Sequence, residues 1–223
     1  MSTTTESIPR MSPLARPGAT VILRLLSDYR MTGLENYPAP PFIVIANHMS
    51  YFDGLVAASL SIRSIPVLTA KKYQGMLMGA FIKTFAAPVW IEQEAPDRQA
   101  LKAALAILKA GHPLAIAPEG TRSKTRQLKA GLEGTAFLVR RAQVPIVPMG
   151  IIGTDHVGRA LRPRVEGRIG KPFDLPPNGA KGRDALREDT DRLMCALAAL
   201  LPERYHGHYA GHPYIAEMAD LVL

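Results

Sequence analysis

The stretch FIVIANHMSYFD, from Phe42 to Asp53, joins the pattern of a buried strand to a pair of residues suited to acid–base chemistry. Its first five residues are apolar and partly β-branched, which is typical of a strand inside a sheet. Residues that follow such a strand emerge at the carboxyl edge of an α/β sheet, where sites commonly form. If the chain then turns into a helix, the Asp53 carboxylate can reach Nδ1 of His48. That contact fixes the imidazole tautomer and leaves Nε2 able to accept a proton.

Strand and helix patterns alternate on both sides of this stretch. Short apolar runs predict strands at 114–117, around Ile146 and at 164–169, and apolar residues at helical spacing predict helices over 97–109, 132–143 and 181–201. The alternation predicts an α/β fold, a single-domain sandwich with a central, largely parallel β-sheet flanked by helices. At 223 residues the chain is long enough for one sizeable core and short for two.

The beginning of the chain differs in composition from the rest. Residues 1–17 are rich in Ser, Thr, Pro and Arg, so we expect a disordered tail there and a folded domain over 18–223. Ala19 to Leu26 is apolar apart from Arg24, and it is too short to span a bilayer, which takes about 20 residues. We expect an amphipathic helix that lies on the protein or in the membrane interface.

A second segment, PEGTRS from Pro118 to Ser123, follows the predicted strand at 114–117. Pro, Gly and small hydroxyl residues at a strand exit allow a tight turn whose exposed N–H groups can hold an anion. Arg122 adds a fork of donors that matches phosphate oxygens, and Lys129 supplies another cation. A polar loop with a solvated arginine is the commoner structure for such a segment. Together with His48, however, it indicates a site where a hydroxyl on a phosphate-bearing molecule loses its proton.

These segments together resemble the glycerolipid acyltransferases of the 1-acylglycerol-3-phosphate acyltransferase type. The family's Asn-His-x4-Asp motif is matched from Asn47 to Asp53, and its Pro-Glu-Gly-Thr-Arg-Ser motif stands intact from Pro118 to Ser123. Three further stretches are similar to family segments in the same order, namely 33–38, 144–149 and 200–205. The resemblance extends over residues 33–210.

The resemblance implies an activity and a set of site residues. The activity is transfer of an acyl group from an acyl thioester, acyl-CoA or an acyl-carrier protein, to the free hydroxyl of a lysophospholipid. The first candidate acceptor is 1-acylglycerol-3-phosphate, which would give phosphatidic acid. His48 would be the general base, oriented by Asp53. The glycerol phosphate would bind to the segment that comprises Glu119, Gly120, Thr121 and Arg122, with Lys129 as a helper. No cofactor or metal is expected beyond the acyl donor, and we expect the protein to be peripheral or monotopic on the cytoplasmic side of the cell membrane.

One family motif is altered in this chain. The second block ends in the family with an arginine implicated in holding the acceptor phosphate, and the corresponding position here is Gln93. Glutamine is neutral and cannot replace a charge-assisted hydrogen bond, which is roughly twice as strong as a neutral one. Either Arg98, Lys83 or Lys129 compensates, or the acceptor carries a different head group. Another lyso-lipid acceptor therefore remains an alternative.

The charge balance points to an anionic partner. The chain carries 27 Lys and Arg against 19 Asp and Glu, a formal charge of +8. Nucleic acid is not expected, because aromatics are 6% of the residues and nothing resembles a stacking platform or a basic recognition helix. We expect an anionic membrane surface instead. The densest basic region, residues 159–171, either is a solvated face or contacts lipid or the acyl donor. A non-enzymatic basic protein that binds membranes is the remaining alternative.

Other apolar and reactive groups are assigned to the core or to solvent. A span over 75–91 is disfavoured because Lys83 at its centre would cost roughly 2.5–3.5 kcal/mol. Its Met-rich part could line an acyl-chain groove, dip into lipid or pack in the core. Cys195 lies in an apolar-periodic helix and is expected to be a small core residue. His206, His208 and His212 lie among glycines, which suggests a solvated tail rather than a metal site.

Overall fold

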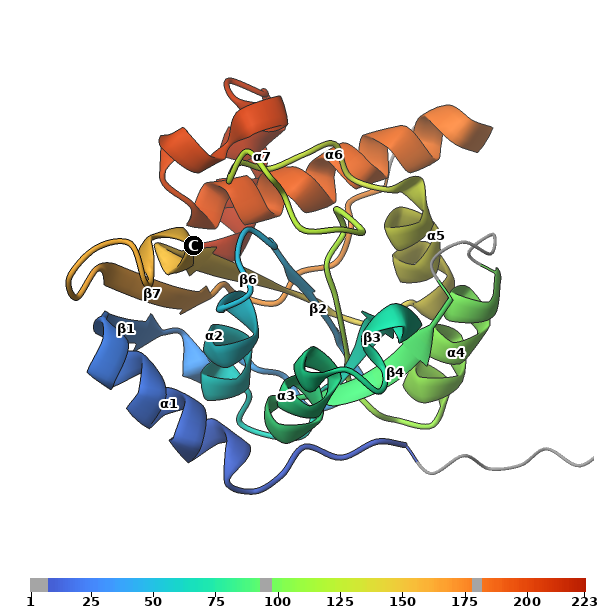
Figure 1. Cartoon of the computed structure of the whole chain (residues 1–223). Coiled ribbons are helices and arrows are strands. Elements are labelled where there is room, and N and C mark those ends of the chain that lie inside the picture. The colour runs from blue at the N-terminus through green and yellow to red at the C-terminus, as the bar shows by residue number, and fades with distance from the viewer. Residues whose placement is uncertain (1–7, 93–97, 178–181) are drawn as a thin grey trace, which may run out of the picture.

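A computed structural model describes residues 8–92, 98–177 and 182–223 of the chain (Figure 1). Within these residues, seven strands form one sheet in the order β1-β7-β6-β2-β5-β3-β4. The strands are β1 (Asp28–Thr32), β2 (Ile43–Ala46), β3 (Pro66–Ala70), β4 (Ala87–Ile91), β5 (Leu114–Ile116), β6 (Ile146–Ile152) and β7 (Arg164–Ile169). Neighbouring strands are parallel except β6 and β7, which are antiparallel. The predicted α/β fold with a largely parallel sheet is therefore confirmed.

Helices cover both faces of the sheet, as Figure 1 shows. The helices are α1 (Ala15–Leu26), α2 (Asp53–Leu60), α3 (Leu77–Phe85), α4 (Arg98–Lys109), α5 (Glu133–Ala142), α6 (Gly182–Leu200) and α7 (Tyr214–Val222). Helices α4 to α7 contribute buried residues to the hydrophobic cluster on one face of the sheet. On the other face, α1 and α2 are buried against the strands, with two phenylalanines of α3 packed beside them.

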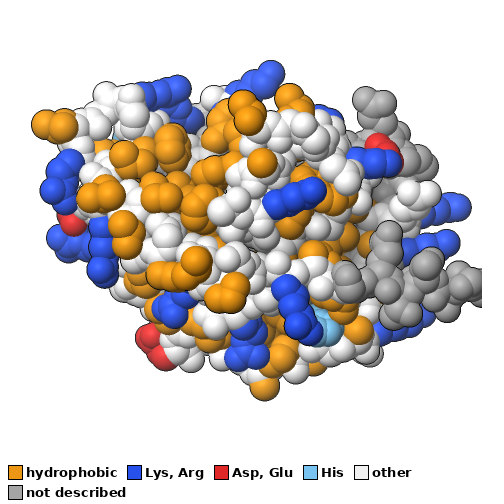
Figure 2. Space-filling view, turned by 60° about the horizontal axis from the view of Figure 1, so that its bottom comes forward, with side chains coloured by type: hydrophobic (Ala, Val, Ile, Leu, Met, Phe, Trp, Pro, Cys, Tyr) orange, Lys and Arg blue, Asp and Glu red, His pale blue; other side chains and the backbone are white. Residues whose placement is uncertain are grey.

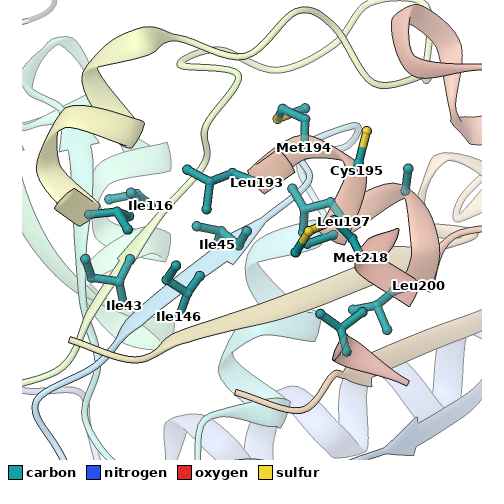
Figure 3. Packing of buried hydrophobic residues seen from close by; sticks show 14 of the residues in the cluster. Ile43, Ile45, Ile116, Ile146, Leu193, Met194, Cys195, Leu197, Leu200 and Met218 are labelled. Carbon is teal, nitrogen blue, oxygen red and sulfur yellow. The ribbon is translucent and has the colours of Figure 1, made fainter. Parts of the chain in front are cut away.

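Strand β2 is buried on both sides, which explains its uninterrupted apolar sequence. Ile43 and Ile45 pack on the α6 side, and Figure 3 shows them among the labelled residues of that cluster, such as Leu193 and Leu197 of α6. Val44 belongs to the cluster on the α1 and α2 side. Because β2, β5 and β6 run parallel, the segments that follow their carboxyl ends come together at one edge of the sheet. This edge carries the site described below.

The folded part of the chain begins earlier than the sequence suggested. Helix α1 starts at Ala15, which is buried, and the Met11 N–H donates to Ser64 Oγ. The predicted tail over 1–17 is therefore wrong for its last residues, while residues 1–7 lie outside the described part. The physical reason is that Pro17 sits in the first turn of α1, where the missing N–H needs no partner. Ala15, Ala19 and Leu23 then form one buried stripe at four-residue spacing.

The apolar stretch at 75–91 divides into α3 and β4, which are separated at Ala86. Among the described residues, no helix combines the length and the apolar character that crossing a bilayer requires. The C-terminal histidines are not in a solvated tail. Tyr205 and Tyr209 are buried, and His206 Nε2 lies 3.0 Å from the Leu201 carbonyl oxygen. The sequence interpretation missed this because glycines lie among the histidines, whereas the buried Tyr205 and Tyr209 anchor the segment.

Candidate active site

His48 and Asp53 form a hydrogen-bonded pair at the carboxyl end of β2. His48 Nδ1 lies 2.8 Å from Asp53 Oδ2, as the sequence predicted. The same oxygen accepts the N–H groups of Met49, at 2.6 Å, and Ser50, at 2.7 Å. Asp53 is buried and is the first residue of α2, where the helix dipole favours a negative charge. The carboxylate is therefore held by donors on all sides and can orient the imidazole.

The remaining oxygen of Asp53 binds a residue that the sequence interpretation missed. Thr154, which follows β6, donates its hydroxyl to Asp53 Oδ1 at 2.5 Å. Thr154 is buried in a short 3₁₀ turn that begins directly after Gly153. The signal was available: residues that follow β6 reach the same sheet edge as those that follow β2.

Asn47 fixes the point where the chain leaves β2. Its Nδ2 donates to the Ile151 carbonyl oxygen and its Oδ1 accepts the Ile151 N–H, both at 2.8 Å. The side-chain amide thus pairs with β6 as a backbone unit would. Because Asn47 is buried, both of its polar atoms need such partners. The turn that carries His48 is therefore anchored directly to the central sheet.

Glu119 links the His48 turn to the loop after β5. Its Oε1 accepts the His48 N–H and its Oε2 accepts the Lys129 N–H, each at 3.0 Å. Burial raises the pKa of the Glu119 carboxyl, an effect that these two backbone hydrogen bonds and the Lys129 charge oppose. The resemblance implied a substrate contact for Glu119. Both of its oxygens are bound by the protein itself, which gives Glu119 a positioning contact, and the substrate contact stays a prediction.

The other predicted residues of this loop gather beside the histidine. The guanidinium of Arg122 stacks 4.1 Å from the centre of the Tyr51 ring, which belongs to the His48 turn. Lys129 Nζ donates to Thr121 Oγ1 at 2.7 Å and to the Glu119 carbonyl at 3.3 Å. The two cations thus make their direct contacts to a ring and to neutral oxygens, although the charge of Lys129 also acts on the nearby Glu119 carboxyl.

Gly120 allows this loop to turn tightly. Its φ is +70°, and a Cβ there would overlap the Leu132 side chain. Residues other than glycine adopt such a φ at a cost. The glycine thus lets the backbone between Glu119 and Thr121 curve around the site, as the sequence predicted for a loop that could hold an anion.

A cavity of about 1210 Å³ contains the site. Its polar end is lined by His48, Asp53, Arg122 and Lys129. Apolar side chains of three helices also line it, among them Met78, Phe81 and Phe85 of α3, Leu101 of α4 and Leu138 of α5, together with the charged Lys72 and Glu92. The volume exceeds the roughly 300–1,000 Å³ of ordinary ligand pockets. The cavity can therefore accept a long apolar molecule with an anionic end.

The altered second block is described only in part. Gln93 lies outside the described residues, and the stretch resumes at Arg98. Of the three cations that could compensate for it, Lys129 lines the cavity, whereas Lys83 and Arg98 are exposed on α3 and at the start of α4. Of these three cations, only Lys129 lines the cavity, and the compensation itself stays a prediction.

The described residues offer neither a metal-binding cluster nor a reactive thiol. In residues 8–92, 98–177 and 182–223, no group of three or more His, Cys, Asp or Glu side chains could hold a metal ion. Cys195 is buried, and burial raises the pKa of its thiol to about 12. Its expected place in the core is confirmed. A thiol with this pKa is a poor nucleophile.

Fold and site together define an α/β protein with a His–Asp pair beside a loop suited to binding an anion. A family model described as Acyltransferase matches residues 28–152, more than half of the chain, and the chain belongs to this family. The match covers both the His48 turn and the Pro118–Ser123 loop.

Several named proteins are similar to this chain. The 1-acyl-sn-glycerol-3-phosphate acyltransferase of Bacillus subtilis is 30% identical over 141 residues, which cover 60% of this chain and 67% of that protein. The chloroplastic protein LPAT1 of Arabidopsis thaliana, with the same activity in its name, is 25% identical over 148 residues. That alignment covers 65% of this chain, and the chain spans only 41% of the plant protein. The solved structure of the 1-acyl-sn-glycerophosphate acyltransferase PlsC from Thermotoga maritima aligns with a TM-score of 0.61 at 23% identity, over 80% of this chain and 75% of that one. It supports the fold.

Proposed function

We propose that this protein transfers an acyl group from an acyl thioester to the free hydroxyl of a lysophospholipid. The first candidate acceptor is 1-acylglycerol-3-phosphate, and the product is then phosphatidic acid. The observation that carries the proposal is the His48–Asp53 pair, 2.8 Å apart, in one cavity with Arg122, Lys129, Lys72 and a long apolar wall. The names of the relatives, which refer to the same acceptor, support it.

In the proposed mechanism, His48 acts as general base. Its Nδ1 is engaged by Asp53, so Nε2 takes the proton of the acceptor hydroxyl as the oxygen attacks the thioester carbonyl carbon. The carbon–oxygen bond forms and the carbon–sulfur bond breaks, and the imidazolium then returns the proton to the leaving thiolate. Asp53 stabilises the imidazolium in between. General-base help of this kind is worth about 10²–10⁴-fold, and holding the two reactants together contributes further.

The acceptor phosphate is proposed to bind between Arg122 and Lys129. Stacking on Tyr51 occupies a face of the Arg122 guanidinium and leaves its N–H groups directed along the plane of the group. Lys129 adds a second positive charge, and Thr121 a hydroxyl, on the same loop. An acyl chain would lie along the apolar wall formed by α3, α4 and α5. The lipid then presents its hydroxyl to His48 at the junction of the two regions.

A membrane surface is proposed as the place where the acceptor is collected. The side of α1 opposite its buried stripe is also apolar, with Leu14, Val21 and Leu25 exposed. Met76 and Leu77, at the start of α3, are exposed as well. Figure 2 shows hydrophobic side chains gathered on the face where α1 and α3 lie, with Lys and Arg side chains around them. Apolar residues ringed by cations favour the surface of an anionic bilayer, and we propose a peripheral position on the cytoplasmic side.

Product identification tests the proposed function. The protein is incubated with mixed lysophospholipids, an acyl-CoA and an acyl-carrier protein loaded with the same chain, and new lipids are identified by mass spectrometry. The proposal expects a diacyl lipid, foremost phosphatidic acid. Binding to vesicles with no thioester consumed from either donor would contradict it and would favour the non-enzymatic alternative.

A different acceptor head group is the second candidate, and Gln93 is the feature that favours it. Turnover is compared across a panel of lysophospholipids for the wild type and for Gln93→Arg. Preference for lysophosphatidic acid in the wild type would remove this candidate. A preference that appears only after Gln93→Arg would support it.

A further inference from the structure

The connection between β6 and β7 holds an apolar side chain out into solvent. Leu161 is 97% exposed, more than any other large hydrophobic residue among those described. Backbone contacts shape the connection before Leu161. The His156 carbonyl accepts the N–H groups of Arg159 and Ala160, and Val157 and Ala160 form a short bridge. A single exposed leucine is ordinary on a protein surface. Two further observations make this one informative.

The first observation is the position of the connection beside α1. The Asp28 N–H, two residues beyond the end of α1, donates to the Pro163 carbonyl at 3.0 Å. Asp28 is also aligned with Arg164 in the pairing of β1 and β7. The last turn of α1 carries Leu25, which is 73% exposed. The connection thus ends next to the end of the apolar surface that α1 presents.

The second observation is the charge around Leu161. Arg159 and Arg162 flank it in sequence, both are exposed, and Arg24 lies in the last turn of α1. Arg164 is different, because Glu166 pairs with it. An apolar side chain between arginines is the pattern of a segment that lies in a lipid interface, where the apolar group enters and the cations bind head groups.

We propose that the β6–β7 connection is a further membrane contact, in which Leu161 enters the interface while Arg159 and Arg162 bind anionic lipid head groups. This inference rests on the proposed membrane location of the protein. It adds a point of attachment to those proposed for α1 and the start of α3. The additional contact constrains the orientation of the cavity relative to the bilayer. An acidic carrier protein would complement the positive charge of Arg159 and Arg162. It would not explain why the connection adjoins the exposed apolar side of α1.

A fluorescent label at position 161 tests the contact directly. Leu161→Cys is labelled with the environment-sensitive dye NBD. Cys195 does not compete, because it is buried and the pKa of its thiol is raised to about 12. We expect brighter, blue-shifted emission with phosphatidylglycerol vesicles. A matched label at Arg141→Cys, exposed on α5, should not respond. No response at 161 while the protein sediments with the vesicles would overturn the inference, as would a response to an acidic acyl-carrier protein without lipid.

Charge removal gives the second measurement. The double variant Arg159→Gln/Arg162→Gln should bind phosphatidylglycerol vesicles roughly 20- to 30-fold more weakly, since each basic residue near an anionic surface contributes about fivefold. Arg141→Gln/Arg187→Gln removes the same charge from exposed positions on α5 and α6 and should bind like the wild type. Equal loss in both pairs would overturn the proposed contact.

Turnover of a short-chain, water-soluble lyso-lipid separates this inference from the proposed function. It should be unchanged in the Arg159→Gln/Arg162→Gln variant, because neither residue lines the cavity. If the wild type turns over this substrate and does not bind vesicles, the membrane contact fails and the proposed reaction stands. If it binds vesicles through residue 161 but turns over no substrate, the reaction fails and the contact stands.

Discussion

Two regions of this protein treat polar and apolar groups in opposite ways. At the carboxyl edge of the sheet, the buried polar groups of Asn47, Asp53 and Glu119 are matched by hydrogen-bond partners within the protein. On the outer side of α1 and at the start of α3, apolar side chains are exposed to solvent. The polar groups of the first region have their hydrogen-bond partners within the protein, whereas no surface of the described residues covers the apolar side chains of the second region. The comparison teaches that the polar network around His48 is preorganised, whereas the exposed apolar surface matches the lipid contact that we propose.

The largest effect is expected from breaking the pair in the first region. Asp53→Asn keeps the size of the side chain but removes the charge that stabilises a protonated His48. We expect kcat for lysophosphatidic acid to fall by about 10²–10⁴-fold. Steady-state kinetics with an acyl thioester measure this. Asp174→Asn, at an exposed position, is the control and should retain full activity. An Asp53→Asn enzyme with normal kcat would show that the pair is not used.

A smaller effect is expected when the hydrogen bond from Thr154 to Asp53 is removed. Thr154→Val leaves Asp53 Oδ1 without its hydroxyl donor. A hydrogen bond to a charged group contributes about 1.5–3 kcal/mol, so kcat should fall on the order of tenfold while KM changes little. Thr154→Ser restores the donor and should restore kcat. If valine and serine behave alike, Thr154 only fills space.

Glu119 tests whether the network stabilises the fold. Glu119→Gln replaces an oxygen that accepts a backbone N–H with an NH₂ group that cannot, which should cost about 1–3 kcal/mol of unfolding free energy. Thermal unfolding should show a Tm lower by about 2–4 °C for each kcal/mol. Exposed Glu203→Gln is the control.

The pH dependence of the unfolding free energy, compared between the wild type and Glu119→Gln, provides a second readout. Burial raises the pKa of Glu119 in the folded state. The carboxyl therefore adds stability that is fully present below its unfolded pKa, about 4.3, and is lost as the pH rises through the folded pKa. The stability difference between wild type and Glu119→Gln should narrow as the pH rises. A difference that widens would contradict the assigned direction.

The smallest effect on folding is expected from substitutions on the exposed apolar side of α1. Val21→Ser/Leu25→Ser changes exposed residues of α1, so the unfolding free energy should change by no more than about 0.5 kcal/mol for each. Binding to phosphatidylglycerol vesicles should weaken on the order of tenfold, because two apolar side chains no longer enter the interface. Vesicle sedimentation measures this. A large loss of stability with unchanged vesicle binding would mean that this side of α1 packs on protein.

The features that the sequence predicted are those that depend on near neighbours in the chain. Strand β2, the turn and the His48–Asp53 contact lie within 12 consecutive residues. Helix α4 matches its predicted range of 97–109 at every residue that the structure describes. Periodicity and local spacing are sufficient for such features.

The features that it missed depend on distant partners. Thr154 reaches Asp53 across 101 positions, and the role of Glu119 is set by the backbone of His48, 71 positions away. Composition also misled at Pro17, where a residue typical of tails lies in the first turn of a helix. These outcomes depend on how the parallel strands align, which no single segment encodes.

Turnover by His48→Ala tests the central claim most directly. The variant is assayed with lysophosphatidic acid and an acyl thioester, after circular dichroism and thermal unfolding have shown that it is folded, and exposed His112→Ala serves as the control. The account predicts that His48→Ala loses at least about 100-fold in kcat while His112→Ala keeps the wild-type rate. Near-normal turnover in a folded His48→Ala protein would contradict it.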